Sequence, residues 1–243
     1  MKPGSCARRL VAEGVGTALL LAAVVGSGIM GDRLSGGNIA IALLANTLAT
    51  GAALVALILT FGPISGAHFN PAVSFADASQ GGLSWPEASM YAVVQIAGAL
   101  IGVALADAMF AEPVYAWSRH ARAGFPQALS EGVATFGLLS VIWGCARRRP
   151  GAVPFAVGAY ITAAYWFTAS TSFANPAVTI ARAATDTFAG IRPNDVPAFL
   201  VSQVIGASGA TILFRWLVPS LPDVAERVVV PHEPDRLTAG QRR

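Results

Sequence analysis

The tripeptide Asn-Pro-Ala occurs twice in this chain, within "SGAHFNPAVSFA" (residues 65–76) and within "TSFANPAVTIAR" (residues 171–182). In both copies a valine follows, and the next residues are all tolerated in helices. Asparagine is a strong helix N-cap, and proline suits the first helical position. Each copy therefore predicts the start of a short helix, formed by Asn70, Pro71 and Ala72 in the first copy and by Asn175, Pro176 and Ala177 in the second.

The rest of the chain contains long stretches without charge. Of its 243 residues, 54% are hydrophobic and 12% are charged, whereas about 25% of a soluble domain is charged. No charged side chain occurs in residues 38–63, 88–106, 151–181 and 196–214. One charged residue, a glutamate, occurs in each of residues 10–31 and 123–146. Since a membrane helix needs about 20 mostly apolar residues, the pattern predicts an all-α membrane protein with six transmembrane helices.

Three blocks of sequence recur in the same order. "AEGVGTALLL" (residues 12–21) matches "SEGVATFGLL" (residues 130–139), and "VVQIAGALIG" (residues 93–102) matches "VSQVIGASGA" (residues 201–210). The two Asn-Pro-Ala copies form the third pair. Three spans per half place the second half in the membrane upside down, which is an inverted repeat. The repeats cover about residues 10–110 and 125–218, in a channel domain of residues 1–219.

Both short helices fall between the second and third span of their half, in segments too apolar for ordinary loops. We therefore expect two re-entrant half-helices whose N-termini meet inside the membrane. Their dipoles would repel cations there, and the amides of Asn70 and Asn175 would donate hydrogen bonds to a passing oxygen. This arrangement predicts a selective pore that needs no cofactor, no metal and no nucleic-acid partner.

Basic residues predict the orientation in the membrane. One group precedes the first span and another lies between the fourth and fifth spans: Lys2, Arg8 and Arg9, then Arg147, Arg148 and Arg149. Six spans place both groups on one side, which the positive-inside rule makes the cytoplasm. Both termini are then cytoplasmic, and residues 220–243 form a polar, mobile tail.

Cysteine and tryptophan residues fall near predicted span ends. Cys6 and Cys145 give no disulfide framework or metal cluster. Trp85, Trp117, Trp143 and Trp216 stand where interfacial anchors are common.

Six spans, a glutamate in the first span of each half, "SGAHFNPAV" and "ANPAV" resemble the major intrinsic protein family, the aquaporins and aquaglyceroporins, over about residues 10–218. The resemblance implies a passive channel for water and small neutral solutes in membrane lipid, not an enzyme. It implies a homotetramer with one pore in each subunit. It also implies that Glu13 and Glu131 brace the re-entrant loops. Gly98 and Gly102, in a G-x-x-x-G pattern, favour close helix packing within or between subunits.

The resemblance further implies a four-residue selectivity filter outside the asparagines. By spacing from the motifs it falls on Thr50, Ala163, Ser172 and Val178. Val178 stands where an arginine is usual, Ala163 where water channels often have histidine, and Thr50 where an aromatic is common. All four are small, so the sequence predicts a wide filter that passes glycerol-sized solutes.

Similar filters without arginine occur in bacterial members of the family that are associated with arsenic-resistance genes. The resemblance to this subgroup implies passage of trivalent (methyl)arsenicals, which are neutral hydroxylated molecules, across a bacterial inner membrane.

Three side chains near the pore leave alternatives open. Arg182, one helical turn beyond Val178, either restores a donor in the outer vestibule or only complements the helix C-terminus. Phe173, like Trp166, is a candidate to refill the space left by the arginine. His68 either lines the inner vestibule, where it could sense pH, or makes a structural hydrogen bond.

Two other functions fit parts of the sequence. A water-selective aquaporin differs only at the filter. A secondary transporter also uses inverted repeats and broken helices, but it needs a coupling-ion site at the midplane. The acidic candidates, Glu13 and Glu131, lie early in their spans rather than beside the asparagines.

Overall fold

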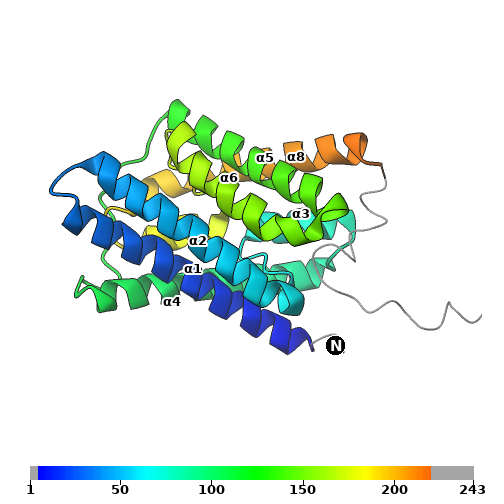
Figure 1. Ribbon diagram of the computed structural model, residues 1–243, viewed down its shortest axis with the longest axis horizontal. Coiled ribbons are helices and arrows are strands. Elements are labelled where there is room, and N and C mark those ends of the chain that lie inside the picture. The colour runs from blue at the N-terminus through cyan, green and yellow to red at the C-terminus, as the bar shows by residue number, and fades with distance from the viewer. Residues whose placement is uncertain (1–4, 220–243) are drawn as a thin grey trace, which may run out of the picture.

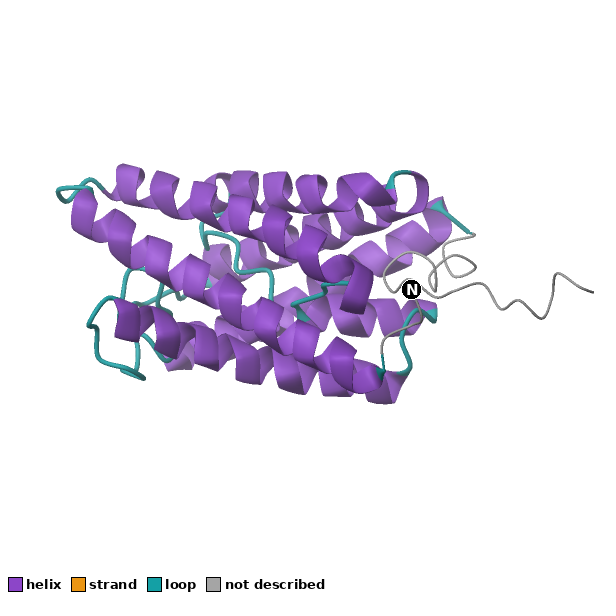
Figure 2. Cartoon of the chain, turned by 60° about the horizontal axis from the view of Figure 1, so that its bottom comes forward, coloured by secondary structure: helices purple, strands orange, loops and turns teal. Residues whose placement is uncertain are grey.

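The computed structural model describes residues 5–219. Lys2 and the predicted tail at residues 220–243 lie outside the described residues, as do the side chains of Arg147 and Arg148. The described residues form α-helices and two short 3₁₀-helices with no strand, which confirms an all-α protein (Figure 2). The elements are α1 (Cys6–Leu34), α2 (Ile39–Ser65), α3 (Pro71–Gln80), α4 (Trp85–Met109), α5 (Phe125–Arg148), η1 (Pro150–Ala152), α6 (Val153–Phe167), α7 (Pro176–Arg182), η2 (Pro193–Asp195) and α8 (Val196–Leu217).

The long helices run lengthwise through one bundle, and α1 begins at the end of the bundle where α8 finishes (Figure 1). We call this the near end, and the opposite one the far end. Within the described residues, five helices are long and apolar enough to cross a membrane: α1, α2, α4, α5 and α8. The sixth predicted span is shorter than expected, since α6 has 15 residues. The 3₁₀-helix η1 directly precedes it, and after Phe167 the chain leaves the helix and turns back into the bundle.

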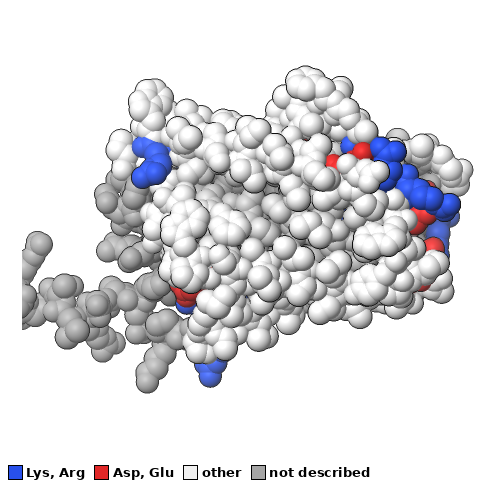
Figure 3. Space-filling view, turned by 180° about the vertical axis from the view of Figure 1, so that it is seen from behind, with Lys and Arg blue, Asp and Glu red and all other residues white. Residues whose placement is uncertain are grey.

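Charged side chains gather at the two ends of the face shown in Figure 3, and the surface between them is free of them. Large apolar side chains are exposed along the long helices, for example on α4 and α8: Val93, Ile101, Leu105, Val201, Val204, Ile205 and Ile212. Such an apolar belt is a surface for hydrocarbon rather than water.

The inverted repeat is visible in the packing of the helices. Helix α1 packs against α2 and α4, and the equivalent α5 packs against α6 and α8. A Cβ atom on Gly98 would lie 2.2 Å from the Gly14 carbonyl oxygen, and one on the equivalent Gly206 would lie 2.3 Å from that of Gly132. Only glycine allows this approach of two backbones. The G-x-x-x-G pattern therefore acts within the subunit.

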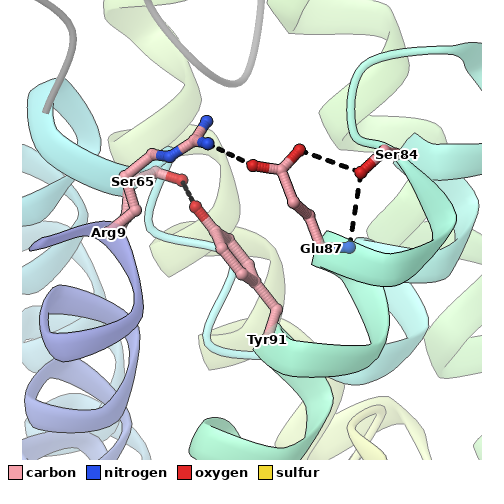
Figure 4. A network of polar contacts seen from close by, with 5 residues as sticks. All are labelled: Arg9, Ser65, Ser84, Glu87 and Tyr91. Carbon is pink, nitrogen blue, oxygen red and sulfur yellow. Dashed lines mark hydrogen bonds and ion pairs between the residues drawn. The ribbon is translucent and has the colours of Figure 1, made fainter. Parts of the chain in front are cut away.

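A polar network joins α1, α2 and α4 at the near end (Figure 4). Arg9 forms an ion pair with Glu87, whose other carboxylate oxygen accepts from Ser84 Oγ at 3.1 Å. The Tyr91 hydroxyl donates to the backbone carbonyl of Ser65 at 2.9 Å. Because Ser65 is the last residue of α2, these bonds hold the entry of the first re-entrant loop.

The structure corrects one tryptophan prediction. Trp85 and Trp216 are exposed at or near helix ends and Trp117 is exposed in the loop between α4 and α5, but Trp143 is only 1% exposed. Its Nε1 donates to Thr211 Oγ1 at 3.4 Å, so this side chain packs between α5 and α8 rather than at a membrane surface. Cys6 and Cys145 are both free and partly buried.

Candidate functional site

Each asparagine caps its own half-helix and also donates a hydrogen bond to the opposite loop. Asn70 Oδ1 accepts from the Ala72 amide at 2.9 Å and caps α3, while its Nδ2 donates to the Ala174 carbonyl at 2.8 Å. Asn175 Oδ1 accepts from the Ala177 amide at 2.9 Å and caps α7, while its Nδ2 donates to the Phe69 carbonyl at 2.8 Å. Each asparagine therefore ties its own half-helix to the opposite loop, and the two helix N-termini meet.

The loops before the asparagines have the same unusual backbone. Ala67 and Phe69 have φ of 50° and 48°, and Ser172 and Ala174, each 105 positions later, both have φ of 48°. Left-handed backbone at a non-glycine residue costs on the order of 1–3 kcal/mol, so surrounding bonds must hold it.

Glu13 supplies those bonds to the first loop. Its Oε1 accepts from the His68 amide at 2.9 Å, and its Oε2 accepts from the Phe69 amide at 2.7 Å. Ser65 Oγ and Gln95 Nε2 donate to the same carboxylate at 2.7 and 2.9 Å. Four donors therefore hold a carboxylate that is fully buried.

Glu131 makes the equivalent bonds to the second loop. It accepts from the Phe173 and Ala174 amides, each at 2.8 Å, and from Gln203 Nε2 at 2.6 Å. Gln203 also donates to Thr179 Oγ1 at 2.8 Å. Both glutamates thus have their oxygens occupied by loop backbone and by a glutamine from the facing helix.

A cavity of about 110 Å³ runs along the bundle beside the asparagines, with room for several water molecules. One side of the cavity is formed by the two loops and the asparagines. The other side is mostly apolar, because α2, α5 and α6 each present every fourth residue to it. These residues are Thr50, Leu54 and Ile58 on α2, Leu138, Ile142 and Ala146 on α5, and Val153, Val157, Ile161 and Tyr165 on α6.

Three of the four predicted filter residues line this cavity: Thr50, Ser172 and Val178. The fourth prediction is corrected. Ala163 lies on the exposed face of α6 and is not among the lining residues. Tyr165, two residues later, faces the cavity instead, and its hydroxyl is 3.4 Å from Thr50 Oγ1. The reason is helical: residues 157, 161 and 165 share one face, and residue 163 points the other way.

Arg182 lines the cavity, and it is 2% exposed. Its guanidinium carbon lies 3.4 Å from the ring centroid of Phe173, and its Nε donates to the Ala189 carbonyl. Of the two open alternatives, the structure places this side chain toward the cavity. Phe173 also lines the cavity and is buried, whereas Trp166 is exposed and fills no part of it.

Arg122 supports the second re-entrant loop, and the sequence analysis did not find it. It lies in the loop between α4 and α5, it is 8% exposed, and its guanidinium carbon is 5.0 Å from the Phe173 ring centroid. Its Nε donates to the Gly190 carbonyl at 2.8 Å and its Nη1 to the Ser170 carbonyl at 3.2 Å. Burial lowers its pKa to about 10, which leaves it charged at pH 7.

His68 lines the cavity on the near side of Asn70. Its Nδ1 lies 3.0 Å from Ser74 Oγ, so the structural hydrogen bond and the vestibule position are both present.

Comparison with known proteins agrees with this geometry. A family model described as "major intrinsic protein" matches residues 1–172. The chain is 54% identical over 220 residues to the aquaglyceroporin AqpS of Rhizobium meliloti (strain 1021), covering 90% of this chain and 94% of that protein. It is 31% identical over 240 residues to a probable aquaporin, AqpM, of Archaeoglobus fulgidus, covering 87% and 97%. Among solved structures, the X-ray structure of the aquaglyceroporin from Plasmodium falciparum has the same fold, with a TM-score of 0.74 at 20% identity, covering 90% of this chain and 100% of that one.

Proposed function

The chain belongs to the major intrinsic protein family and is a membrane channel for water and small solutes, not an enzyme, and we propose that its pore also passes neutral solutes of glycerol size, including trivalent (methyl)arsenicals. The observation that carries the proposal is Val178. It lies in the cavity wall, 5% exposed, three residues after the second asparagine. A valine there donates no hydrogen bond and carries no charge, so the passage beside it is wider than an arginine would leave it.

The two sides of the cavity support a polyol-like substrate. Hydroxyl groups of the solute would donate to loop carbonyls and accept from the amides of Asn70 and Asn175. The carbon side of the solute would face Leu54, Ile58 and Val157. Trivalent arsenicals resemble glycerol in being small, neutral and hydroxylated, and the name aquaglyceroporin, given to a relative 54% identical over 220 residues, agrees with solutes of this class.

We place selectivity against protons at the asparagines. Each Nδ2 carries two N–H groups, and one of them donates to a carbonyl of the opposite loop. The second donor of each amide would orient a water molecule between them. With both half-helix dipoles pointing at the same place, that water would not relay protons.

We propose the assembly and location that the family resemblance implies. Residues 1–219 form the channel domain of a homotetramer, with one pore in each subunit. The near end faces the cytoplasm of a bacterium, with both termini and the tail at residues 220–243 on that side, because the basic residues flank the spans there.

A water-selective channel is the second candidate, and Tyr165 and Arg182 favour it. Both side chains line the cavity, Tyr165 beside Thr50 and Arg182 against Phe173, and would narrow the passage that Val178 leaves wide. A secondary transporter is disfavoured, because the carboxylates of Glu13 and Glu131 already bind loop amides and glutamines and have no oxygen left free for a coupling ion.

Stopped-flow light scattering on reconstituted vesicles tests the proposal. Purified protein and its Val178→Arg variant are compared for water, glycerol and arsenous acid. We expect the wild type to pass all three, and the variant to lose glycerol and arsenous acid while it keeps water. Wild-type vesicles that pass only water would support the water-selective candidate instead.

A further inference from the structure

Arg182 is fixed at the far end of the cavity by contacts on several sides. It is the last residue of α7, four positions after Val178. The Phe173 ring lies against its guanidinium, its Nε donates to the Ala189 carbonyl, and its own carbonyl accepts from the Ile191 amide at 3.2 Å. A guanidinium held over an aromatic face keeps its planar orientation. The charge is therefore positioned rather than mobile.

This charge has no carboxylate partner among residues 5–219. The ion pairs described there join Arg9 to Glu87, Arg33 to Glu112, Arg119 to Asp186 and Arg192 to Asp195. Glu131, which binds the second loop, gives its oxygens to backbone amides and Gln203. The guanidinium of Arg122, over the same Phe173 ring, donates to carbonyls and to the Thr171 hydroxyl, and of the Arg122 donors only the backbone amide bonds to the Asp195 carboxylate.

The wall beside Arg182 would otherwise attract cations. The second loop lines the cavity at Ser172, Phe173 and Ala174, and the C-terminal end of α7, at Arg182, adds partial negative charge. Backbone carbonyl oxygens that line a pore can replace the hydration shell of a cation. A fixed positive charge at this point opposes the entry of cations.

We propose that Arg182, seated on Phe173, supplies a barrier to cations at the far end of the pore, which position 178 lacks and which adds to the dipole barrier at the asparagines, so that the pore is wide for neutral solutes and closed to potassium, sodium and protons. Arg122 acts through Phe173 and the loop as a positioning residue. The inference rests on the proposed function, since it assigns ion exclusion within the same pore.

The test measures ion leak and neutral flux on the same vesicles. Wild type, Arg182→Gln and Arg182→Gln/Val178→Arg are reconstituted, and potassium-driven proton leak is followed with an enclosed pH-sensitive dye. We expect the leak to rise about tenfold or more in Arg182→Gln, because the variant lacks the positive charge that repels cations from a poorly hydrated part of the pore. In the double variant, an arginine at position 178 should return the leak toward the wild-type level.

The matched control is Arg119→Gln, which removes an arginine from the exposed ion pair with Asp186 at the same end. Its leak and water flux should equal those of the wild type. Water flux shows that each protein is folded. An Arg182→Gln variant that conducts water but leaks no more ions than the control overturns the inference. If that variant conducts no water, Phe173→Leu takes its place: a leak above the control supports the inference, and none overturns it.

The two proposals fail separately. Wild-type vesicles that exclude glycerol contradict the proposed solute range, and the leak comparison still tests Arg182, because it depends only on ions and water.

Discussion

The carboxylate of Glu131 accepts from two amides of one strained loop and from Gln203. The loop should therefore be destabilised by the loss of a single carboxylate oxygen. In Glu131→Gln, one acceptor becomes a donor that faces an amide hydrogen. We expect a loss of about 1–3 kcal/mol, the penalty of an unsatisfied buried polar group. A thermal unfolding curve of the purified protein in detergent should show a melting temperature several degrees lower, with reduced water flux in vesicles.

The control for that change is Glu112→Gln, which removes a carboxylate from a solvent-exposed pair with Arg33. Exposed pairs contribute about 0–1 kcal/mol, so the melting temperature should stay near that of the wild type. Equal melting temperatures for Glu131→Gln and Glu112→Gln would show that Glu131 does not brace the loop.

Ser172 and Ala163 test which residues line the filter. Ser172→Phe puts a ring into the cavity wall, and we expect glycerol flux in vesicles to fall at least about tenfold, since pore diameter sets the passage of a solute. Ala163→Leu extends a side chain on the exposed face of α6 and should leave glycerol flux unchanged. A loss of glycerol flux in Ala163→Leu with an intact chromatographic profile would return Ala163 to the filter.

The filter shows where spacing in the sequence predicts a site and where it does not. Val178 lies inside α7, and Ser172 lies in a loop that Glu131 holds in place. A spacing of three residues from Asn175 therefore predicts both cavity-lining positions correctly. The count back to Ala163 crosses residues 168–174, which are not helical. The count misses the residue of α6 that faces the cavity by two positions. The period of α6 itself, at residues 153, 157, 161 and 165, indicates Tyr165.

At the scale of helices, α4 approaches the backbone of α1, and α8 that of α5, at glycine positions. Gly98→Ala should place a methyl group against the Gly14 carbonyl, and Gly206→Ala one against that of Gly132. Overpacking of this kind costs about 1–3 kcal/mol, so both variants should melt at lower temperature in detergent. Gly62→Ala is the matched control. Its Cβ would meet nothing within 4 Å, and alanine is the better helix former. A control that melts as early as the other two would contradict this account of the packing.

Helix existence could be predicted from apolar length, and the order and pairing of the halves from the repeated blocks. The length of α6 could not, because residues 151–181 form one charge-free run in which the helix end carries no charge or glycine. Arg122 could not be found either. A basic residue in a connecting loop usually faces water, and only the folded loop shows that its guanidinium is buried against Gly190 and Ser170.

For the whole molecule, exposed apolar surface on α2 and α6 fits contact with other copies of the chain. This surface includes Ile39, Ile41, Leu44, Leu48, Phe155 and Trp166. We expect the protein in mild detergent to have a protein mass of four chains of 24.9 kDa, about 100 kDa. Light scattering coupled to size-exclusion chromatography measures it. A monomer that conducts water would contradict the proposed tetramer.

The measurement that tests the central claim most directly is glycerol flux through the wild-type protein in vesicles, as a function of the glycerol gradient. For a wide passive pore we predict a flux that rises linearly with the gradient and does not change when proton and sodium gradients are collapsed. No glycerol flux above that of empty vesicles, or a flux that saturates and follows an ion gradient, would contradict the account.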